Sequence, residues 1–427
     1  MSDLKKKLDF ITGKNKKNQV ESITDSQGLS TKQKLEELVN KNLKNRSLKI
    51  KEERTQENIN FDNDFEVINY NYPMSSVFGK VTLSEWDDTG ASTISTIFND
   101  PELGDIDPLK LLYFDTETTG LSGGTGTIPF MLGFGFIEGN SFEVRIFVLN
   151  DPAREGLFLE EVDRFLDELD IAGVVTYNGK SFDYPLMETR YILNRKKFPL
   201  LDYPHLDYLT PARMIWKNTF ESRKLGYLGD ILLNISRDDD VDGSLIPRLY
   251  FEYLRSGNFS MIEKVVEHNA LDIVGLSALL LLGCRYIDDI SRTSEEGEIL
   301  GVALLNEKSG LFSDAEKFYN HLNKHALRDE IIAQSVKRLA LIKKKKKLFE
   351  EAEGLWKTLS EHGDKLAFRE MSIYLEHRKK DFAGAVEFVE KGLELAEISE
   401  AQRKDFEKRL ARLKRKIAGI SGGIVKY

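Results

Sequence analysis

The stretch LLYFDTETTG, residues 111–120, predicts a buried β-strand that ends in two carboxylates. Its first four residues are large and apolar, and Asp115 and Glu117 then follow two positions apart. Because successive side chains of a strand alternate between its two faces, both carboxylates point from the same face. Neighbouring like charges repel each other, so this strand end favours a site where cations or polar groups offset the repulsion.

Two later segments carry acidic residues that fit the same site. Asp183 lies in YNGKSFDYP, where Asn178 and Phe182 precede it and a helix is predicted to begin. It is either a site carboxylate or the N-cap of that helix. Asp272 lies four residues after His268 in HNALDIVGL, so on a helix the two side chains share one face. This spacing suits a ligand beside a general base, and it also suits a histidine that only packs.

The chemistry of these side chains points to divalent cations. Asp115, Glu117, Asp183 and Asp272 are hard oxygen donors, which Mg²⁺ and Mn²⁺ prefer. Two such ions would activate a water and stabilise the leaving oxygen of a phosphodiester. No cluster of Cys and His favours zinc. The Gly-rich stretch GLSGGTGTIP, residues 120–129, lacks the Gly-Lys-Ser/Thr ending of a phosphate loop, and we predict a hairpin turn there.

The chain is long enough for two or three domains, because 427 residues exceed the size of one ordinary core. Residues 1–63 are rich in Lys, Asn, Gln and Ser and predict a flexible basic and polar tail. No run of 18 apolar residues and no secretion signal are seen, so we expect no membrane span. The lone Cys284 excludes an internal disulfide and, with these features, predicts a cytoplasmic protein. The net charge of −9 decides little about partners.

Residues 64–293 alternate short apolar runs with helical patterns, which is typical of an α/β domain. After the strand at 109–117 we predict two antiparallel strands at 128–139 and 141–150. A helix at 155–169 and another buried strand at 172–178 follow. The segment 261–290 has apolar residues at three- and four-residue spacing and predicts one or two helices that close the domain.

Residues 294–427 contain a repeat of helical pattern. Three segments align without gaps and place Phe312, Phe349 and Phe382 together, and likewise Ala315, Ala352 and Ala385. The periods are 37 and 33 residues. Helix pairs of this period with small residues at the packing seam resemble tetratricopeptide repeats, which stack to bury their apolar faces. The repeats either pack on the preceding domain or bind a protein partner, and a basic capping helix ends the chain.

The order Asp-x-Glu, Asn-x-x-x-Phe-Asp and a helical His with Asp resembles the DEDD superfamily of 3′-to-5′ exonucleases. The closer resemblance, from about Pro108 to Gly283 and on into the repeats, is to the YprB-type ribonuclease H-like domain family. It implies an α/β fold with a ribonuclease H-like mixed sheet and flanking helices, followed by an all-α tetratricopeptide-like region. One spacing departs from the superfamily. Its histidine branch has the base five residues before the last Asp, whereas His268 stands at the four-residue spacing of the tyrosine branch.

The resemblance implies a role for each site residue. The catalytic residues would be Asp115, Glu117, Asp183, His268 and Asp272, and the four carboxylates would bind two Mg²⁺ or Mn²⁺ ions. We assign substrate binding to Thr116, Asn178 and Phe182. The implied reaction is two-metal hydrolysis of single-stranded nucleic acid from its 3′ end. No residue distinguishes DNA from RNA, because contacts to a 2′-hydroxyl cannot be read from sequence.

Two other functions remain compatible with these residues. Ribonuclease H-like folds also support structure-selective endonucleases. Alternatively, the chain is a non-catalytic scaffold whose repeats bind a protein. Phe182 or Tyr184 is predicted to stack on unpaired bases, and His205 and Asp207 in YPHLDYL either touch substrate or cap the fold.

Overall fold

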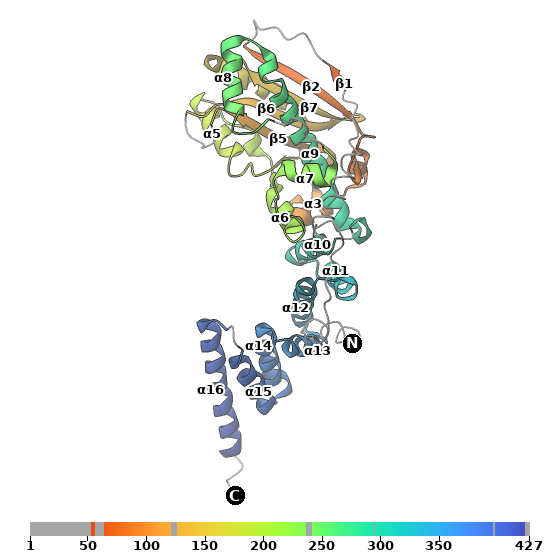
Figure 1. Cartoon of the computed structure of the whole chain (residues 1–427), viewed down its shortest axis with the longest axis vertical. Helices are drawn as coiled ribbons and strands as arrows, with labels where there is room; N and C mark the ends of the chain where they lie inside the picture. The colour runs from red at the N-terminus through yellow and green to blue at the C-terminus, as the bar shows by residue number, and fades with distance from the viewer. Residues whose placement is uncertain are drawn as a thin grey trace, which may run out of the picture. The chain divides into compact units, whose positions relative to one another are not determined.

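The computed structural model describes residues 53–55, 64–120, 126–235, 241–293, 295–395 and 398–422. The chain divides into two compact units, and the division falls between Ser294 and Glu295. The first unit holds a mixed sheet with helices, and the second consists of helices in its described part (Figure 1). The predicted fold class, an α/β sheet with flanking helices followed by an all-α region, is confirmed.

The sheet has seven strands in the order β1-β2-β7-β6-β5-β8-β9. Neighbours from β1 to β5 are antiparallel, whereas β5, β8 and β9 run parallel. The bounds are β1 Glu53–Thr55, β2 Phe65–Pro73, β5 Leu111–Thr118, β6 Pro129–Glu138, β7 Ser141–Leu149, β8 Gly173–Thr176 and β9 His205–Asp207. A separate ladder joins β3 Val77–Phe78 to β4 Val81–Thr82. The two antiparallel strands predicted after β5 are therefore β6, which pairs with β5, and β7, which pairs with β6.

Two sequence predictions concern segments that the structure describes only in part. Most of the predicted N-terminal tail lies outside the described residues. Within it, Glu53–Thr55 forms the edge strand β1, which pairs with β2. The Gly-rich stretch joins the antiparallel neighbours β5 and β6, and Thr119 N donates to Ile128 O at 3.0 Å at its base. Residues 121–125 of this stretch lie outside the described residues.

The helices of this unit are α3 Ala91–Phe98, α4 Glu155–Asp167, α5 Asp183–Leu193, α6 Leu209–Trp216, α7 Leu225–Leu233, α8 Ile246–Ser256 and α9 Glu263–Asp288. Alternating side chains of β6 show which helices cover which face. Phe134 and Phe136 contact Phe165 of α4, with ring centroids 5.5 and 5.6 Å apart. Gly133 and Gly135 lie against α9. Because successive residues point to opposite faces, α4 and α9 cover opposite faces of the sheet.

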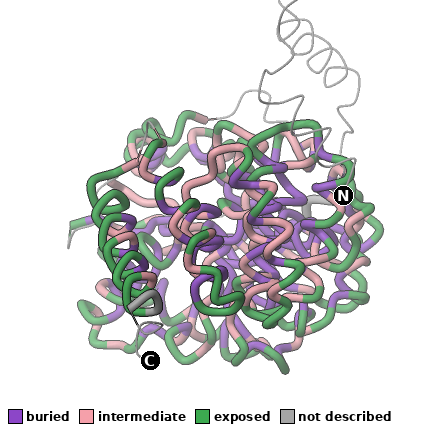
Figure 2. The backbone as a smooth tube through the Cα atoms, turned by 90° about the horizontal axis from the view of Figure 1, so that it is seen from below, coloured by how far each residue is buried: buried purple, intermediate pink, exposed green. Residues whose placement is uncertain are grey.

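Helix α9 is the long element across the sheet in Figure 1 and contacts β5, β6 and β7. Among the described residues it is also long and apolar enough to cross a membrane, but 83% of its most apolar window is buried inside the unit. Figure 2 shows buried and exposed residues alternating in short stretches along the chain, the pattern that amphipathic elements produce.

The predicted closing segment forms one continuous helix of 26 residues, α9.

Gly133 allows α9 to approach β6 closely. A Cβ atom at this position would stand 2.0 Å from Oδ1 of Asn269 and 2.3 Å from Cδ1 of Ile273. Both distances are far below van der Waals contact. Gly133 also pairs with Asp115 in the register of β5 and β6. The glycine therefore lets α9 reach the carboxylate at the end of β5.

We expect Gly133→Ala to lower the free energy of unfolding by about 1–3 kcal/mol, because α9 must move away from the sheet. Gly104→Ala is the matched control, since a Cβ atom there meets nothing within 4 Å. Urea denaturation of both variants measures the difference. Equal midpoints for the two variants would show that the close approach is not needed.

The described part of the second unit contains the α-helices α10 Glu296–Lys308, α11 Phe312–His325, α12 Asp329–Lys345, α13 Phe349–Glu361, α14 Lys365–Tyr374, α15 Phe382–Leu393 and α16 Glu400–Gly422. A π-helical turn, Leu375–Lys379, continues α14. The aligned residues Phe312, Phe349 and Phe382 each begin the second helix of a pair. Ala315, Ala352 and Ala385 are fully buried. The aligned segments are therefore structurally equivalent helix pairs.

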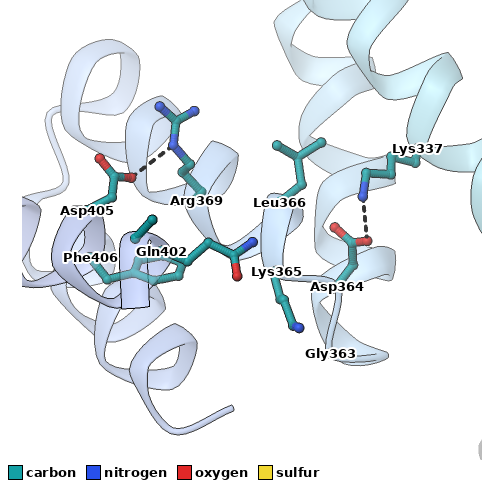
Figure 3. Close-up of a pocket in the computed structure, with 10 residues that line it drawn as sticks. Lys337, Gly363, Asp364, Lys365, Leu366, Arg369, Gln402, Asp405 and Phe406 are labelled. Carbon is teal, nitrogen blue, oxygen red and sulfur yellow. Dashed lines mark hydrogen bonds and ion pairs between the residues drawn. The ribbon is translucent and has the colours of Figure 1, made fainter. Parts of the chain in front are cut away.

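A hollow of about 600 Å³ lies within this helical unit, lined from α12, α14 and α16 (Figure 3). Lys337 reaches Asp364 at 3.2 Å, and Arg369 reaches Asp405 at 3.0 Å. Asp364 also caps α14, because its side chain accepts from the backbone of Ala367. The charged groups of the hollow are thus engaged with one another.

Candidate metal and nucleic-acid site

The carboxyl end of β5 is held between two helices. On one face, Oγ1 of Thr116 donates to Oδ1 of Asp183, the first residue of α5, at 2.6 Å. On the other face, Nδ2 of Asn269 in α9 donates to Oδ2 of Asp115 at 2.8 Å. Because Asp115 and Thr116 are consecutive, these two contacts fix the strand end from both sides.

Helix α9 also carries the predicted histidine and carboxylate. Nε2 of His268 lies 3.3 Å from Oδ2 of Asp272, and both side chains are 15% exposed. The two residues are one helical turn apart on one face, as their spacing predicted. The helix therefore presents His268, Asn269 and Asp272 together near the sheet.

The other three carboxylates affect the pKa of Asp115. Burial raises the pKa of Asp115 well above its ordinary value, and repulsion from Asp183, Asp272 and Glu117 raises it further. Electrostatic attraction to His268 lowers this pKa. We call Asp115, Glu117, Asp183 and Asp272 the carboxylate cluster. The repulsion acting on Asp115 shows that segments far apart in the sequence bring the other three acids near it.

Asp183 is perturbed in the same sense. It is buried, and this burial raises its pKa to about 6, although the hydrogen bond from Thr116 favours the ionised form. Asp207 adds a further repulsive charge. A buried carboxylate that titrates near neutral pH is a frequent feature of functional sites.

The carboxylate cluster has the oxygen donors of a divalent-cation site, but its side chains are not arranged around a common point. In the described ranges no three His, Cys, Asp or Glu side chains converge as a metal site. Asp115 instead accepts from Asn269, and Asp183 accepts from Thr116. Oδ1 of Asn269 is buried without a hydrogen-bond partner and is one more oxygen donor here. The residues fit hard cations, because carboxylate and amide oxygens are the donors that such ions prefer.

The loop that follows β8 is shaped by Asp207. The carboxylate of Asp207 accepts from the backbone N–H groups of Asn178, Lys180 and Leu209, at 2.8, 3.2 and 3.1 Å. Asn178 has a positive φ of 73°, a conformation that Asn adopts more readily than most residues. Of the two roles open for Asp207, the structure shows the capping one. His205 also packs inside, with its ring stacked 3.5 Å from that of Tyr184.

The two aromatic candidates for base stacking differ in the structure. Phe182 is 58% exposed immediately before α5, so its ring is accessible beside Asp183. Tyr184 is buried against His205, Phe114 and Phe198. Of these two alternatives only Phe182 is exposed, because the second residue of α5 points into the core while the residue before the helix faces outward.

Sequence reasoning missed two residues of this site. Asn269 holds Asp115, and Gly133 makes room for Asn269. The only local signal for Asn269 was its place three residues before Asp272 on the same helix. The hydroxyl of Thr116, which we assign to substrate binding, also donates to Asp183.

Comparison with known proteins agrees with this architecture. Residues 112–282 match the RNase_H superfamily. The chain is also similar to the Uncharacterized protein YprB of Bacillus subtilis (strain 168), with 31% identity over 356 residues. The match covers 81% of this chain and 84% of the relative. The matched superfamily region contains every member of the carboxylate cluster.

Proposed function

We propose that this chain, which belongs to the YprB family of ribonuclease H-like proteins, is a metal-dependent 3′-to-5′ exonuclease of single-stranded nucleic acid. Membership of the superfamily supports nucleic-acid binding and hydrolysis in general. The observation that carries the finer proposal is that the negative charges of Asp183, Asp272 and Glu117 all raise the pKa of Asp115. Such a concentration of negative charge beside a phosphodiester requires cations.

In this proposal two Mg²⁺ or Mn²⁺ ions are held by the carboxylate cluster. When bound, they supply an activated water and stabilise charge on the leaving oxygen. The chain's own residues set the geometry. Asn269 orients Asp115, and Thr116 orients Asp183, each through one hydrogen bond. Because both donors come from rigid elements, the cluster is fixed before substrate arrives.

His268 is the proposed general base. Its Nε2 lies 3.3 Å from Asp272, so an Nε2–H donated to that carboxylate leaves Nδ1 as the acceptor of a proton. Asp272 then fixes the tautomer and also stabilises the imidazolium formed when Nδ1 takes up a proton. Phe182, exposed beside Asp183, is the proposed platform for a terminal base.

We expect His268→Ala to lower turnover by roughly a hundredfold, because general bases contribute at about this level. The loss should be accompanied by disappearance of the acidic limb of the pH–rate profile. His205→Ala is a control for general effects of removing a histidine near the site. A pH–rate profile of His268→Ala that matches the wild type would assign His268 to packing.

We further propose that the helix pairs of the second unit are tetratricopeptide-like. The support is the period of 37 and 33 residues and the fully buried alanines at the packing seam. Such repeats would also provide a surface for a protein partner.

A further inference from the structure

We infer that the turns within the helix pairs of the second unit form a basic edge that binds the phosphates of a nucleic-acid strand. The basic edge comprises Lys345, Lys346, Lys347, Arg378, Lys379 and Lys380, all of which are exposed. Lys345 ends α12, Lys346 and Lys347 lie between α12 and α13, and the others lie between α14 and α15. This inference rests on the proposed function for the choice of nucleic acid as the ligand.

Contacts between successive turns show that these residues follow one edge of the stack. Nζ of Lys345 lies 4.0 Å above the ring of Phe312, and the guanidinium of Arg378 lies 4.1 Å above the ring of Phe349. Each cation thus reaches back to the phenylalanine of the preceding pair. Lys416 of α16 continues the series, 5.6 Å from Phe382. The cations therefore form one continuous row.

Much of this charge is not neutralised locally. Lys346 pairs with Glu316 at 3.0 Å, Lys379 approaches Glu353 at 3.7 Å, and Lys416 pairs with Glu376 at 2.8 Å. Among the described residues, no carboxylate lies within ion-pair distance of Lys345, Lys347, Arg378 or Lys380. These four cations complement a phosphate backbone.

Two of the lysines lie at positions where the backbone conformation favours glycine. Lys347 and Lys380 have positive φ values of 62° and 57°. The aligned residue of the first repeat is Gly310, with φ of 78°. Glycine adopts this left-handed conformation without steric cost, and lysine does not. The turn geometry therefore does not explain the lysines, whereas a need for charge does.

The test is the double variant Lys347→Gly, Lys380→Gly in the full chain, with binding of a fluorescein-labelled 30-nucleotide single strand followed by anisotropy in EDTA. Thermal stability should be unchanged or higher, because glycine relieves the left-handed conformation. Affinity at low salt should fall roughly tenfold, and the slope of log affinity against log salt should fall by about 1.4, as expected for two lost contacts.

The matched control is Lys317→Ala, Lys357→Ala, which removes the same charge from exposed positions on α11 and α13. These lysines lie five and eight residues beyond the phenylalanines that begin their helices, roughly 7–12 Å along the axis. The control should bind like the wild type. Equal loss in both variants, or no loss in the glycine variant, would overturn the basic edge.

Two further outcomes separate this inference from its alternatives. If the glycine variant binds the oligonucleotide normally but loses binding to vesicles containing anionic lipid, the edge faces a membrane and the inference is wrong. If the wild type binds the strand through the edge but hydrolyses nothing with Mn²⁺ present, the inference stands and the proposed nuclease activity fails. Binding is measured in EDTA, so the two failures are distinguishable.

Discussion

Replacing Asp115 with asparagine is expected to abolish hydrolysis, with a loss of roughly a thousandfold or more. Asp115 is the member of the carboxylate cluster that all three others act upon, and it lies at the end of the central strand β5. Asparagine keeps the size of the side chain and its carbonyl can still accept from Asn269. The substitution therefore removes the charge that would hold a cation while preserving the local contact.

The variant should fold at least as well as the wild type when metal is absent. Burial and repulsion raise the pKa of Asp115, so the folded state binds its proton more tightly than the unfolded state. Stability of the metal-free fold is then lost as pH rises. For Asp183, stability is lost as the pH rises from the ordinary carboxyl pKa of 3.8 to the raised pKa of about 6. Asp115→Asn removes the destabilisation that ionised Asp115 causes at neutral pH.

The matched control is Asp170→Asn, which removes the same charge from an exposed acid paired with Lys110 at 2.6 Å. Lys110 immediately precedes β5, so the control tests the opposite end of the same strand. Rates with Mn²⁺ on an end-labelled strand and melting curves with and without Mn²⁺ should be measured for both. Wild-type hydrolysis by Asp115→Asn would exclude the proposed site.

Local sequence patterns were sufficient to predict the elements that carry the acids. The apolar run at residues 111–114 predicted β5, and the helical spacing of His268 and Asp272 predicted their shared face on α9. Asp183 begins α5, as its position before a helical segment indicated. These predictions depend only on periodicity within one element, so tertiary packing had little chance to alter them.

Contacts between distant elements could not be predicted in the same way. Asn269 and Asp115 are 154 residues apart, and their pairing depends on a glycine in a third segment. No period in the sequence connects these positions. The exposure of Phe182 and the burial of Tyr184 likewise follow from how α5 docks on the sheet, which adjacent residues alone do not reveal. The acidic residues could be predicted from local sequence patterns, but the contacts that support them are visible only in the folded structure.

A 5′-labelled linear single strand is expected to shorten stepwise into a ladder, whereas a circular single strand of the same sequence should survive. An exonuclease site needs a free end, and exposed Phe182 beside Asp183 offers a surface on which the last unpaired base can stack. A blunt duplex must first melt its terminal pair and should be degraded more slowly. Mg²⁺ or Mn²⁺ should be required, and EDTA should inhibit.

The circle is the decisive substrate because it contains the same bonds but no end. Phe182→Ala should slow digestion of the linear strand by roughly ten- to a hundredfold, since base stacking contributes about 1–3 kcal/mol. The exposed Leu193→Ala, at the other end of α5, is its control. Cutting of the circle by the wild type but not by Asp115→Asn would mean that the carboxylate cluster admits an internal phosphodiester. The endonuclease alternative would then replace the exonuclease proposal, with the same four carboxylates as its ligands.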